Sequence, residues 1–365
     1  MSAVSTPVSA RSPGPDVVRA VAMAGVVVMN YHGYLILRGG REEGGAVYDL
    51  FDPWNGPLAT RFAATFVLTA GVGVTLMTRS SMNDPQRLNR MSWRLARRGL
   101  LLYGFGIAFN FIWSGTILPY YGALFVLAAV LFRLTSWWLA VIGSAAAVAG
   151  WAVNWWLFER SLDGKDTRWL TNPGPRSPVG LMADVFVYGT HPLFPWLAFF
   201  CAGIVVGRLI DTTRPSSRWW RPATVAAGFG LVVVATFAGL AATGVRSSEV
   251  LSTHPFDRGL AYTASALGTA LVAFALITAA ADAFATTATV RVLQSAGQLS
   301  LSVYVVHALV FNLLVDWLDV IEPGGIATSL GFAAAVWLAT MVAAVAYQRR
   351  FGRGPVETLY RVLSG

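Results

Sequence analysis

Residues 16–37, DVVRAVAMAGVVVMNYHGYLIL, form an apolar stretch that is long enough to cross a bilayer as a helix. The stretch nevertheless carries Asp16 and Arg19 at its start, and Asn30 and His32 near its far end. Charged and strongly polar side chains are costly in or beside hydrocarbon, so their presence in a span indicates a functional site. We therefore expect this segment to contribute to a reaction centre.

A second apolar stretch, residues 57–77 (PLATRFAATFVLTAGVGVTLM), follows a charged and aromatic connection over residues 38–54. Together the two stretches predict a membrane hairpin with polar chemistry at both of its ends. We expect this hairpin to supply half of the reaction centre.

The composition of the 365-residue chain is that of a membrane protein. The chain is 55% hydrophobic and 12% charged, with a mean hydropathy of +0.57, whereas a soluble domain has about 25% charged residues. The net charge of +9 comes largely from arginines in short loops between apolar runs, which is a topology signal and not a sign of nucleic-acid binding. The single cysteine, Cys201, leaves no disulfide framework, and the four scattered histidines predict no metal site.

The apolar runs predict an all-α polytopic membrane protein with about ten transmembrane helices. We also expect a short re-entrant or interfacial helix over residues 181–188. The ten predicted spans cover residues 16–37, 57–77, 99–113, 118–132, 137–158, 191–208, 222–242, 262–281, 299–318 and 326–347.

Arginine distribution predicts the orientation of these spans. Loops that are rich in arginine, above all residues 78–99, are expected in the cytoplasm, and mixed or acidic loops outside. Both termini then face the cytoplasm. We expect a disordered cytoplasmic tail over residues 1–15, one transmembrane domain over residues 16–348, and a basic cytoplasmic tail over residues 349–365.

The candidate catalytic residues lie near the outer boundary. A neutral imidazole at His32 can remove a proton from an acceptor, and the Asn30 amide can orient a carbonyl group. The alternative for His32 is an interfacial side chain that reaches the headgroups. Asp52 and Arg61 flank a Trp-Asn-Gly turn on the outer side and are expected at the mouth of the same cavity.

The candidate donor-binding residues lie deeper and on the inner side. His307 falls near the bilayer midplane, one turn after Tyr304, where a histidine needs a polar partner or a cavity. Arg94, Arg97 and Arg98 form a cluster whose guanidinium groups suit phosphates; the alternative is an ordinary topology signal.

A further candidate is Arg19, which shares a helix face with Asp16 at the inner boundary. The alternative for this pair is a helix-start acid beside a positive-inside arginine.

Four motifs, in order along the chain, resemble the integral-membrane acetyltransferases typified by heparan-alpha-glucosaminide N-acetyltransferase and their bacterial relatives. The motifs are D-V-V-R over residues 16–19 with Asn30 downstream, W-N-G over residues 54–56, H-P-L-F-P-W over residues 191–196, and G-Q-L-S-L-S-V-Y-V-V-H over residues 297–307. Each motif alone is weak, but their order and spacing along most of the chain are specific for the superfamily.

The resemblance implies acyl transfer from a cytosolic acyl-CoA to an acceptor on the far side of the membrane, and it matches Asn30 to the family's active-site asparagine. The sequence departs from the family pattern at two places. Ala20 replaces the glycine after Arg19, and Phe51 and Asp52 occupy the neighbourhood of the family's histidine before Trp-Asn-Gly. His32 is then expected to take over that role from the first helix, with Asp52 as the next candidate.

We therefore predict an acyltransferase, with acetyl-CoA or another acyl-CoA as donor, of the bacterial inner (plasma) membrane. The expected acceptor is an amine or hydroxyl of an envelope sugar or glycolipid. Direct transfer in a ternary complex is the expected mechanism, and a covalent acyl-histidine route is the alternative; a homodimer also stays open. The rival function is a transporter or flippase for an envelope precursor, although no inverted repeat is visible in the sequence. A scaffold without catalytic activity would leave Asn30, His32 and His307 unexplained.

Overall fold

The computed structural model describes residues 12–171, 177–210 and 218–365. These residues form helices joined by turns and loops, with no strand among them, which confirms the predicted all-α class. The helices are α1 (Gly14–Ile36), α2 (Ala46–Phe51), α3 (Arg61–Thr78), η1 (Arg79–Ser81), α4 (Pro85–Phe109), α5 (Leu118–Leu131), α6 (Ser136–Leu162), α7 (Arg168–Thr171), α8 (Pro178–Ala183), η2 (Asp184–Tyr188), α9 (Leu193–Leu209), α10 (Trp220–Leu240), α11 (Val245–Val250), α12 (Leu260–Ala283), α13 (Ala288–Gln298), α14 (Ser300–Phe311), η3 (Asn312–Trp317), α15 (Ile326–Phe351) and α16 (Pro355–Ser364).

Each of the ten predicted spans overlaps a helix, but fewer of these helices are long and apolar enough to cross a membrane. Within the described residues six helices meet this requirement: α3 with η1, α6, α10, α12, α14 with η3, and α15. A seventh is present if α8 with η2 and α9, which meet at a bend of 56°, form one broken span. The multi-pass architecture is confirmed, whereas a count of ten is not.

The remaining predicted spans fall short for separate reasons. The helix α5 has 14 residues, and the first half of α4 is basic. In α1 the polar residues Asp16, Arg19, Asn30 and His32 lower the mean hydropathy. The bend before α9 agrees with the short re-entrant or interfacial helix that the sequence predicts over residues 181–188.

The predicted loop over residues 78–99 is helical for most of its length, so that prediction is wrong. Asp84 is the N-cap of α4, and its Oδ1 accepts hydrogen bonds from Gln86 N at 2.9 Å and Arg87 N at 3.2 Å. Pro85 follows at the first helical position, where a missing N–H costs nothing. The arginines of this segment are therefore spread over a helix surface.

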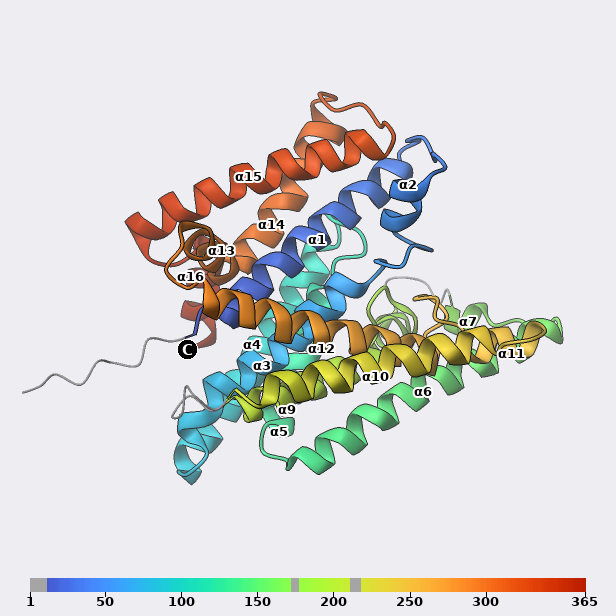
Figure 1. The fold of residues 1–365 in the computed structure, drawn as a ribbon, viewed down its shortest axis with the longest axis horizontal. Helices are drawn as coiled ribbons and strands as arrows, with labels where there is room; N and C mark the ends of the chain where they lie inside the picture. The colour runs from blue at the N-terminus through green and yellow to red at the C-terminus, as the bar shows by residue number, and fades with distance from the viewer. Residues whose placement is uncertain (1–11, 172–176, 211–217) are drawn as a thin grey trace, which may run out of the picture.

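Helix α1 lies at the centre of the molecule. It packs against α3, α12, α13, α14 and α15, and Figure 1 shows it between the α14–α15 part and the α10–α12 part. One of its contacts is unusually close, because a Cβ atom on Gly297 would overlap the Asp16 carbonyl oxygen. The predicted hairpin of α1 and α3 is thus the element around which the other helices gather.

Small residues bring the neighbouring helices of the membrane domain together. Gly203 and Gly207, one turn apart on α9, face α3, where a Cβ atom on Gly203 would overlap the Leu68 carbonyl oxygen. Gly228 of α10 and Gly268 of α12 face each other in the same way. In a bilayer, where lipid and side chains are equally apolar, such close packing is a main source of helix association.

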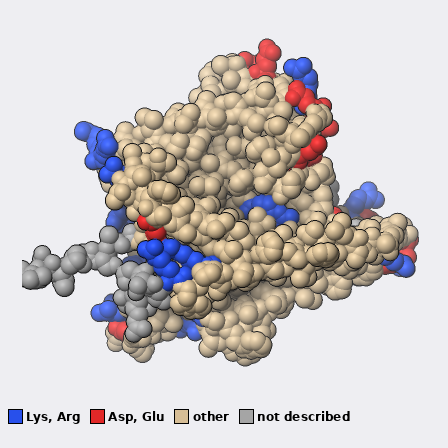
Figure 2. Space-filling view, in the orientation of Figure 1, with Lys and Arg blue, Asp and Glu red and all other residues tan. Residues whose placement is uncertain are grey.

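The outer surface of the bundle is apolar. The most apolar stretches of α10 and α15 are only 17% and 22% buried, so most of their hydrophobic side chains face outward. On the face shown in Figure 2, charged side chains gather at the ends of the long helices and in one central hollow, while the broad surface between them is neutral. A surface of this kind is stable in lipid and not in water.

The C-terminal end of the chain packs against the bundle. Residues 1–11 of the predicted N-terminal tail lie outside the described residues, and α1 already begins at Gly14. At the other end, α15 continues to Phe351, and α16 packs against α4 and α14. Glu357 of α16 accepts hydrogen bonds from Leu301 N at 2.8 Å and Ser302 N at 3.0 Å, and so satisfies two open N–H groups at the start of α14.

Candidate functional site

The central polar contact of the bundle joins α1 to α14. The Asn30 Nδ2 atom lies 3.2 Å from the Nε2 atom of His307. His307 is 1% exposed and Asn30 is half-buried. The hydroxyl of Tyr31, the next residue of α1, donates to the His307 carbonyl oxygen at 2.8 Å. Two residues that are far apart in the sequence thus meet in the interior.

The hydrogen bonds around the His307 ring define its tautomer. Its Nδ1 atom lies within hydrogen-bond distance of the Tyr304 carbonyl oxygen, which accepts only. Nδ1 therefore carries the proton, and Nε2 offers a lone pair to the Asn30 amide. In the neutral ring the basic nitrogen is therefore directed at Asn30.

Aromatic side chains enclose this pair. The ring of Trp113 meets His307 edge to face at 5.5 Å, and the ring of Tyr304 lies 4.9 Å from it. The Tyr304 hydroxyl in turn contacts Thr116 Oγ1 at 3.1 Å and accepts from Ile117 N at 3.1 Å. The Ser-Gly-Thr turn before α5 therefore fixes Tyr304, and Tyr304 fixes the imidazole of His307.

His32 lies on the opposite face of α1 from Asn30, because residues two apart on a helix point in different directions. Its Nδ1 atom lies 3.1 Å from Ser329 Oγ on α15, and its ring meets Tyr48 edge to face at 5.3 Å. The side chain is 1% exposed, and its Nε2 atom has no hydrogen-bond partner in the structure. The structure does not bring Asn30 and His32 to one point, contrary to the arrangement expected from the sequence.

Asp52 organises the loop that leads to α3. Its Oδ1 atom accepts hydrogen bonds from Trp54 N at 2.8 Å and Asn55 N at 2.9 Å, and its Oδ2 atom accepts from the Asn55 side chain at 3.2 Å. Desolvation by burial raises the pKa of this carboxyl. The hydrogen bonds from Asn55 and Trp54 together lower the pKa by more than desolvation raises it, so the pKa lies below its usual value. Asp52 therefore stays charged, as the cap of a turn.

The inner end of α1 forms a second polar cluster. Asp16 is buried, and its Oδ2 atom accepts from Gln298 Nε2 at 3.0 Å. Arg19 Nη1 lies 3.4 Å from both Asp16 Oδ1 and the Gly297 carbonyl oxygen. The D-x-x-R motif is therefore joined to the start of the last motif, at the junction of α13 and α14.

The predicted arginine cluster divides between two environments. Arg94 and Arg97 are exposed on α4, whereas Arg98 is half-buried. Arg98 Nη1 donates to Met77 Sδ at 2.8 Å, its guanidinium lies 5.9 Å from the ring centre of Tyr360, and the Tyr360 hydroxyl donates to its carbonyl oxygen. Arg98 thus fastens α16 to α4, while the other two arginines point outward.

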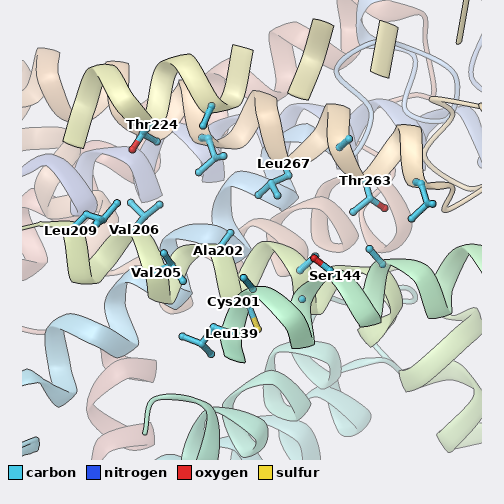
Figure 3. Close-up of a pocket in the computed structure, with 18 of the residues that line it drawn as sticks. Leu139, Ser144, Cys201, Ala202, Val205, Val206, Leu209, Thr224, Thr263 and Leu267 are labelled. Atoms are coloured by element: carbon cyan, nitrogen blue, oxygen red, sulfur yellow. The ribbon is translucent and has the colours of Figure 1, made fainter. Parts of the chain in front are cut away.

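A separate cavity of about 540 Å³ lies between α6 and α9 on one side and α10 and α12 on the other (Figure 3). Its walls are almost entirely apolar, with Leu139, Cys201, Val205 and Leu267 among them. None of the predicted site residues lines it. It suits hydrocarbon, and no histidine or carboxylate among the described residues lines it, so we place the candidate reaction centre at Asn30 and His307.

Several contact residues were not singled out from the sequence. Thr116, Tyr31 and Trp113 support His307, and Ser329 supports His32. A lone serine or tryptophan in an apolar run gives no signal of its own, although the turn before α5 marks Thr116. No group of three or more His, Cys, Asp or Glu side chains arranged to hold a metal occurs within residues 12–171, 177–210 and 218–365.

Comparisons with known families cover the whole of this region. The model of the family "Heparan-alpha-glucosaminide N-acetyltransferase, catalytic" matches residues 11–242, which is more than half of the chain and includes α1 through α10. A second family model, "Protein of unknown function (DUF418)", matches residues 207–365, which include His307. No curated protein matches the chain. The chain therefore belongs to the family of membrane acyltransferases described by the heparan-alpha-glucosaminide N-acetyltransferase catalytic domain.

Proposed function

We propose that the protein transfers an acetyl group from acetyl-CoA in the cytoplasm to an amine or hydroxyl of an envelope sugar or glycolipid outside the bacterial inner membrane. The family name supplies the reaction class and suggests an amino sugar as acceptor. The observation that carries the proposal is the hydrogen bond between the half-buried Asn30 and the buried His307. It presents a basic nitrogen and an amide in the interior of a chain that has both family matches.

In this proposal His307 is the general base. Its Nδ1–H faces the Tyr304 carbonyl, which stabilises the ring when Nε2 takes up a proton. The acceptor N–H or O–H loses its proton to Nε2 while its nitrogen or oxygen attacks the thioester carbonyl carbon. The C–S bond then breaks, and the proton passes from Nε2 to the sulfur, which leaves as the free thiol. Such general-base assistance contributes typically ~10²–10⁴-fold to the rate.

Asn30 has two roles in the same step. In the resting protein its amide N–H groups satisfy Nε2 and hold the imidazole in place. When the acceptor displaces this contact, the amide is free to donate to the oxygen of the thioester carbonyl as negative charge develops there. A preorganised donor of this kind is worth about 10²–10³-fold.

We propose the basic surface of α4 as the docking site for the donor. Arg94 and Arg97 are exposed and able to contact the CoA phosphates. Arg19 lies further along the path, and Asn30 follows it about 16 Å along α1 at ~1.5 Å per residue. A flexible pantetheine arm is suited to a separation of this size, with Tyr304 and His307 positioning its acyl end.

The experiment that tests the proposal uses purified protein, radiolabelled acetyl-CoA and an extract of envelope glycolipids. With the unmodified protein, label should appear in the glycolipid fraction. With His307→Ala the rate of labelling should fall by about 10²–10⁴-fold. His32→Ala is the comparison, because it removes an equally buried histidine from the other face of α1. Equal transfer by the unmodified protein and His307→Ala would exclude His307 as the base.

A further inference from the structure

A buried arginine at the outer end of α3 has no acidic partner. Arg61 is the first residue of α3, and its side chain is 9% exposed. Nε makes one long hydrogen bond to the Pro57 carbonyl oxygen at 3.4 Å, and the guanidinium lies 5.4 Å from the ring centre of Tyr262. Nη1 is buried without a hydrogen-bond partner, and in the described part of the chain no ion pair joins Arg61 to an acid. Burying an unpaired guanidinium is costly, so the position of Arg61 calls for a functional explanation.

The other arginine that is buried to this extent is treated differently by the fold. Arg258 is 8% exposed and donates to the carbonyl oxygens of Val187, Tyr188 (3.0 Å) and Gly189 (2.7 Å), which end the short helix η2. Its guanidinium is satisfied by the protein itself. Arg61, by contrast, keeps donors unused, so its burial is not explained by packing alone.

Other polar groups lie near the start of α3. Side chains on a helix lean toward its N-terminus, and the bond from Nε to Pro57 shows that the Arg61 guanidinium turns back past the start of α3. Thr60 precedes α3 without a side-chain cap, so the N-terminal end of the helix keeps its positive partial charge. The Tyr262 hydroxyl lies beside it, 2.8 Å from Thr60 Oγ1.

The acid of the adjoining loop does not pair with Arg61. Figure 2 shows basic side chains at the floor of a central hollow, over the region where α3 and α12 lie side by side in Figure 1. Asp52, the acid of the adjoining loop, already accepts three hydrogen bonds from Trp54 and Asn55. The hydrogen-bonding capacity of Asp52 is therefore used within its own loop, and no ion pair joins it to Arg61 in the described residues.

We propose that Arg61, the N-terminal end of α3 and the Tyr262 hydroxyl bind a phosphate group of the acceptor on the outer side of the membrane. A guanidinium, free helix N–H groups and a hydroxyl that donates while it accepts from Thr60 suit the several oxygens of a phosphate better than the two of a carboxylate. The acceptor class is then a phosphate-bearing glycan or glycolipid. This assignment rests on the proposed acetyl transfer, which it deepens by naming the acceptor.

The test measures the thermal unfolding midpoint of the purified full chain with and without phosphate ligands. The probes are sn-glycerol 3-phosphate in detergent, and nanodiscs of phosphatidylglycerol compared with phosphatidylcholine. The unmodified protein should be stabilised by a phosphate probe. Arg61→Gln should bind that probe roughly 10- to 100-fold more weakly, since it loses a charged donor, whereas Arg61→Lys should keep part of the binding. Arg246→Gln is the matched control, because it removes one outer positive charge that is exposed and paired with Glu159.

The midpoint without ligand distinguishes a binding role from a structural one. If Arg61 is an anion-binding residue, Arg61→Gln removes an uncompensated buried charge. The unfolding midpoint without ligand should then be equal to that of the unmodified protein or higher. If Arg61 serves only to hold the Tyr262 ring, the same change should lower the midpoint and leave the phosphate response intact. The second result overturns the proposal, as does the absence of any phosphate response in the unmodified protein.

The two probes separate the sources of the phosphate. An Arg61-dependent response to glycerol phosphate assigns the site to a soluble or glycan-borne group, and a response to phosphatidylglycerol alone assigns it to a lipid headgroup. Transfer assays keep this inference apart from the proposed function. If Arg61→Gln still transfers acetyl groups with an unchanged KM for the acceptor, the phosphate site is refuted and the proposed acetyltransferase activity stands. If the protein binds phosphate in an Arg61-dependent way but transfers no acetyl group, the proposed activity is refuted and the phosphate site stands.

Discussion

Changing Asn30 and His307 one at a time and then together tests whether they act as a unit. The Asn30 amide donates to a nitrogen that is almost fully buried, so Asn30→Ala leaves Nε2 of His307 without a partner. An unsatisfied buried acceptor costs about 1–3 kcal/mol of stability. His307→Ala removes the same hydrogen bond from the other side, together with its contacts to Trp113 and Tyr304.

The combined variant should therefore be less destabilised than the sum of the two single variants. For residues in direct contact the difference is ~0.5–3 kcal/mol. It is read from chemical unfolding in detergent, followed by intrinsic fluorescence. In the transfer assay Asn30→Ala should lose about 10²–10³-fold in turnover and His307→Ala about 10²–10⁴-fold. The double variant should be as active as the less active of the two single variants, because the pair serves one step.

His32→Ala provides the contrast for this cycle. Its ring contacts Ser329 and Tyr48 on the other face of α1, so it should lower stability modestly and leave turnover close to that of the unmodified protein. If the losses of stability in Asn30→Ala and His307→Ala are additive, the two residues do not act as a unit. The reasoning is also refuted if turnover collapses in His32→Ala and stays normal in His307→Ala. In that case α1 supplies the base from its opposite face.

Three further predictions concern topology, donor binding and packing. A cysteine introduced at Arg90, in a protein whose Cys201 is replaced by alanine, should react with an impermeant reagent only from the cytoplasmic side; labelling from outside contradicts the assigned orientation. Replacing Arg94 and Arg97 by glutamine should weaken acyl-CoA binding in a calorimetric titration and leave the unfolding midpoint unchanged; unaltered affinity would make both a topology signal only. Gly203→Leu should destabilise the protein by about 1–3 kcal/mol or more through overlap with the α3 backbone, and an unchanged midpoint would contradict the close packing of α9 on α3.

Much of the fold was predictable because a bilayer imposes strong constraints on a sequence. The apolar runs, separated by arginine-rich segments, predicted the spans, and each predicted span contains helix. The polar side chains within residues 16–37 indicated that this segment is the central helix. The number of full spans was not predictable in the same way. Short or charged helices such as α4 and α5 are stabilised by packing against each other, which hydropathy does not measure.

The candidate site was predictable in its residues but not in its pairing. Asn30, His32 and His307 each stand out as polar groups within apolar runs. Their nearness in the sequence suggested that Asn30 and His32 act together, whereas helix geometry sends them to α14 and α15 respectively. The absence of an acidic partner for Arg61 among the described residues was not predictable from the sequence either, because it depends on which acids lie close to Arg61 in space.

The most direct test of the central claim is transfer across a sealed membrane. The protein is reconstituted in proteoliposomes of known orientation, with acetyl-CoA labelled in its acetyl group on the cytoplasmic side and the glycolipid acceptor on the other side. Label is expected on the acceptor beyond the membrane, with a loss of about 10²–10⁴-fold in His307→Ala. Movement of the acceptor across the membrane without any acetylation would contradict it and would favour a transporter.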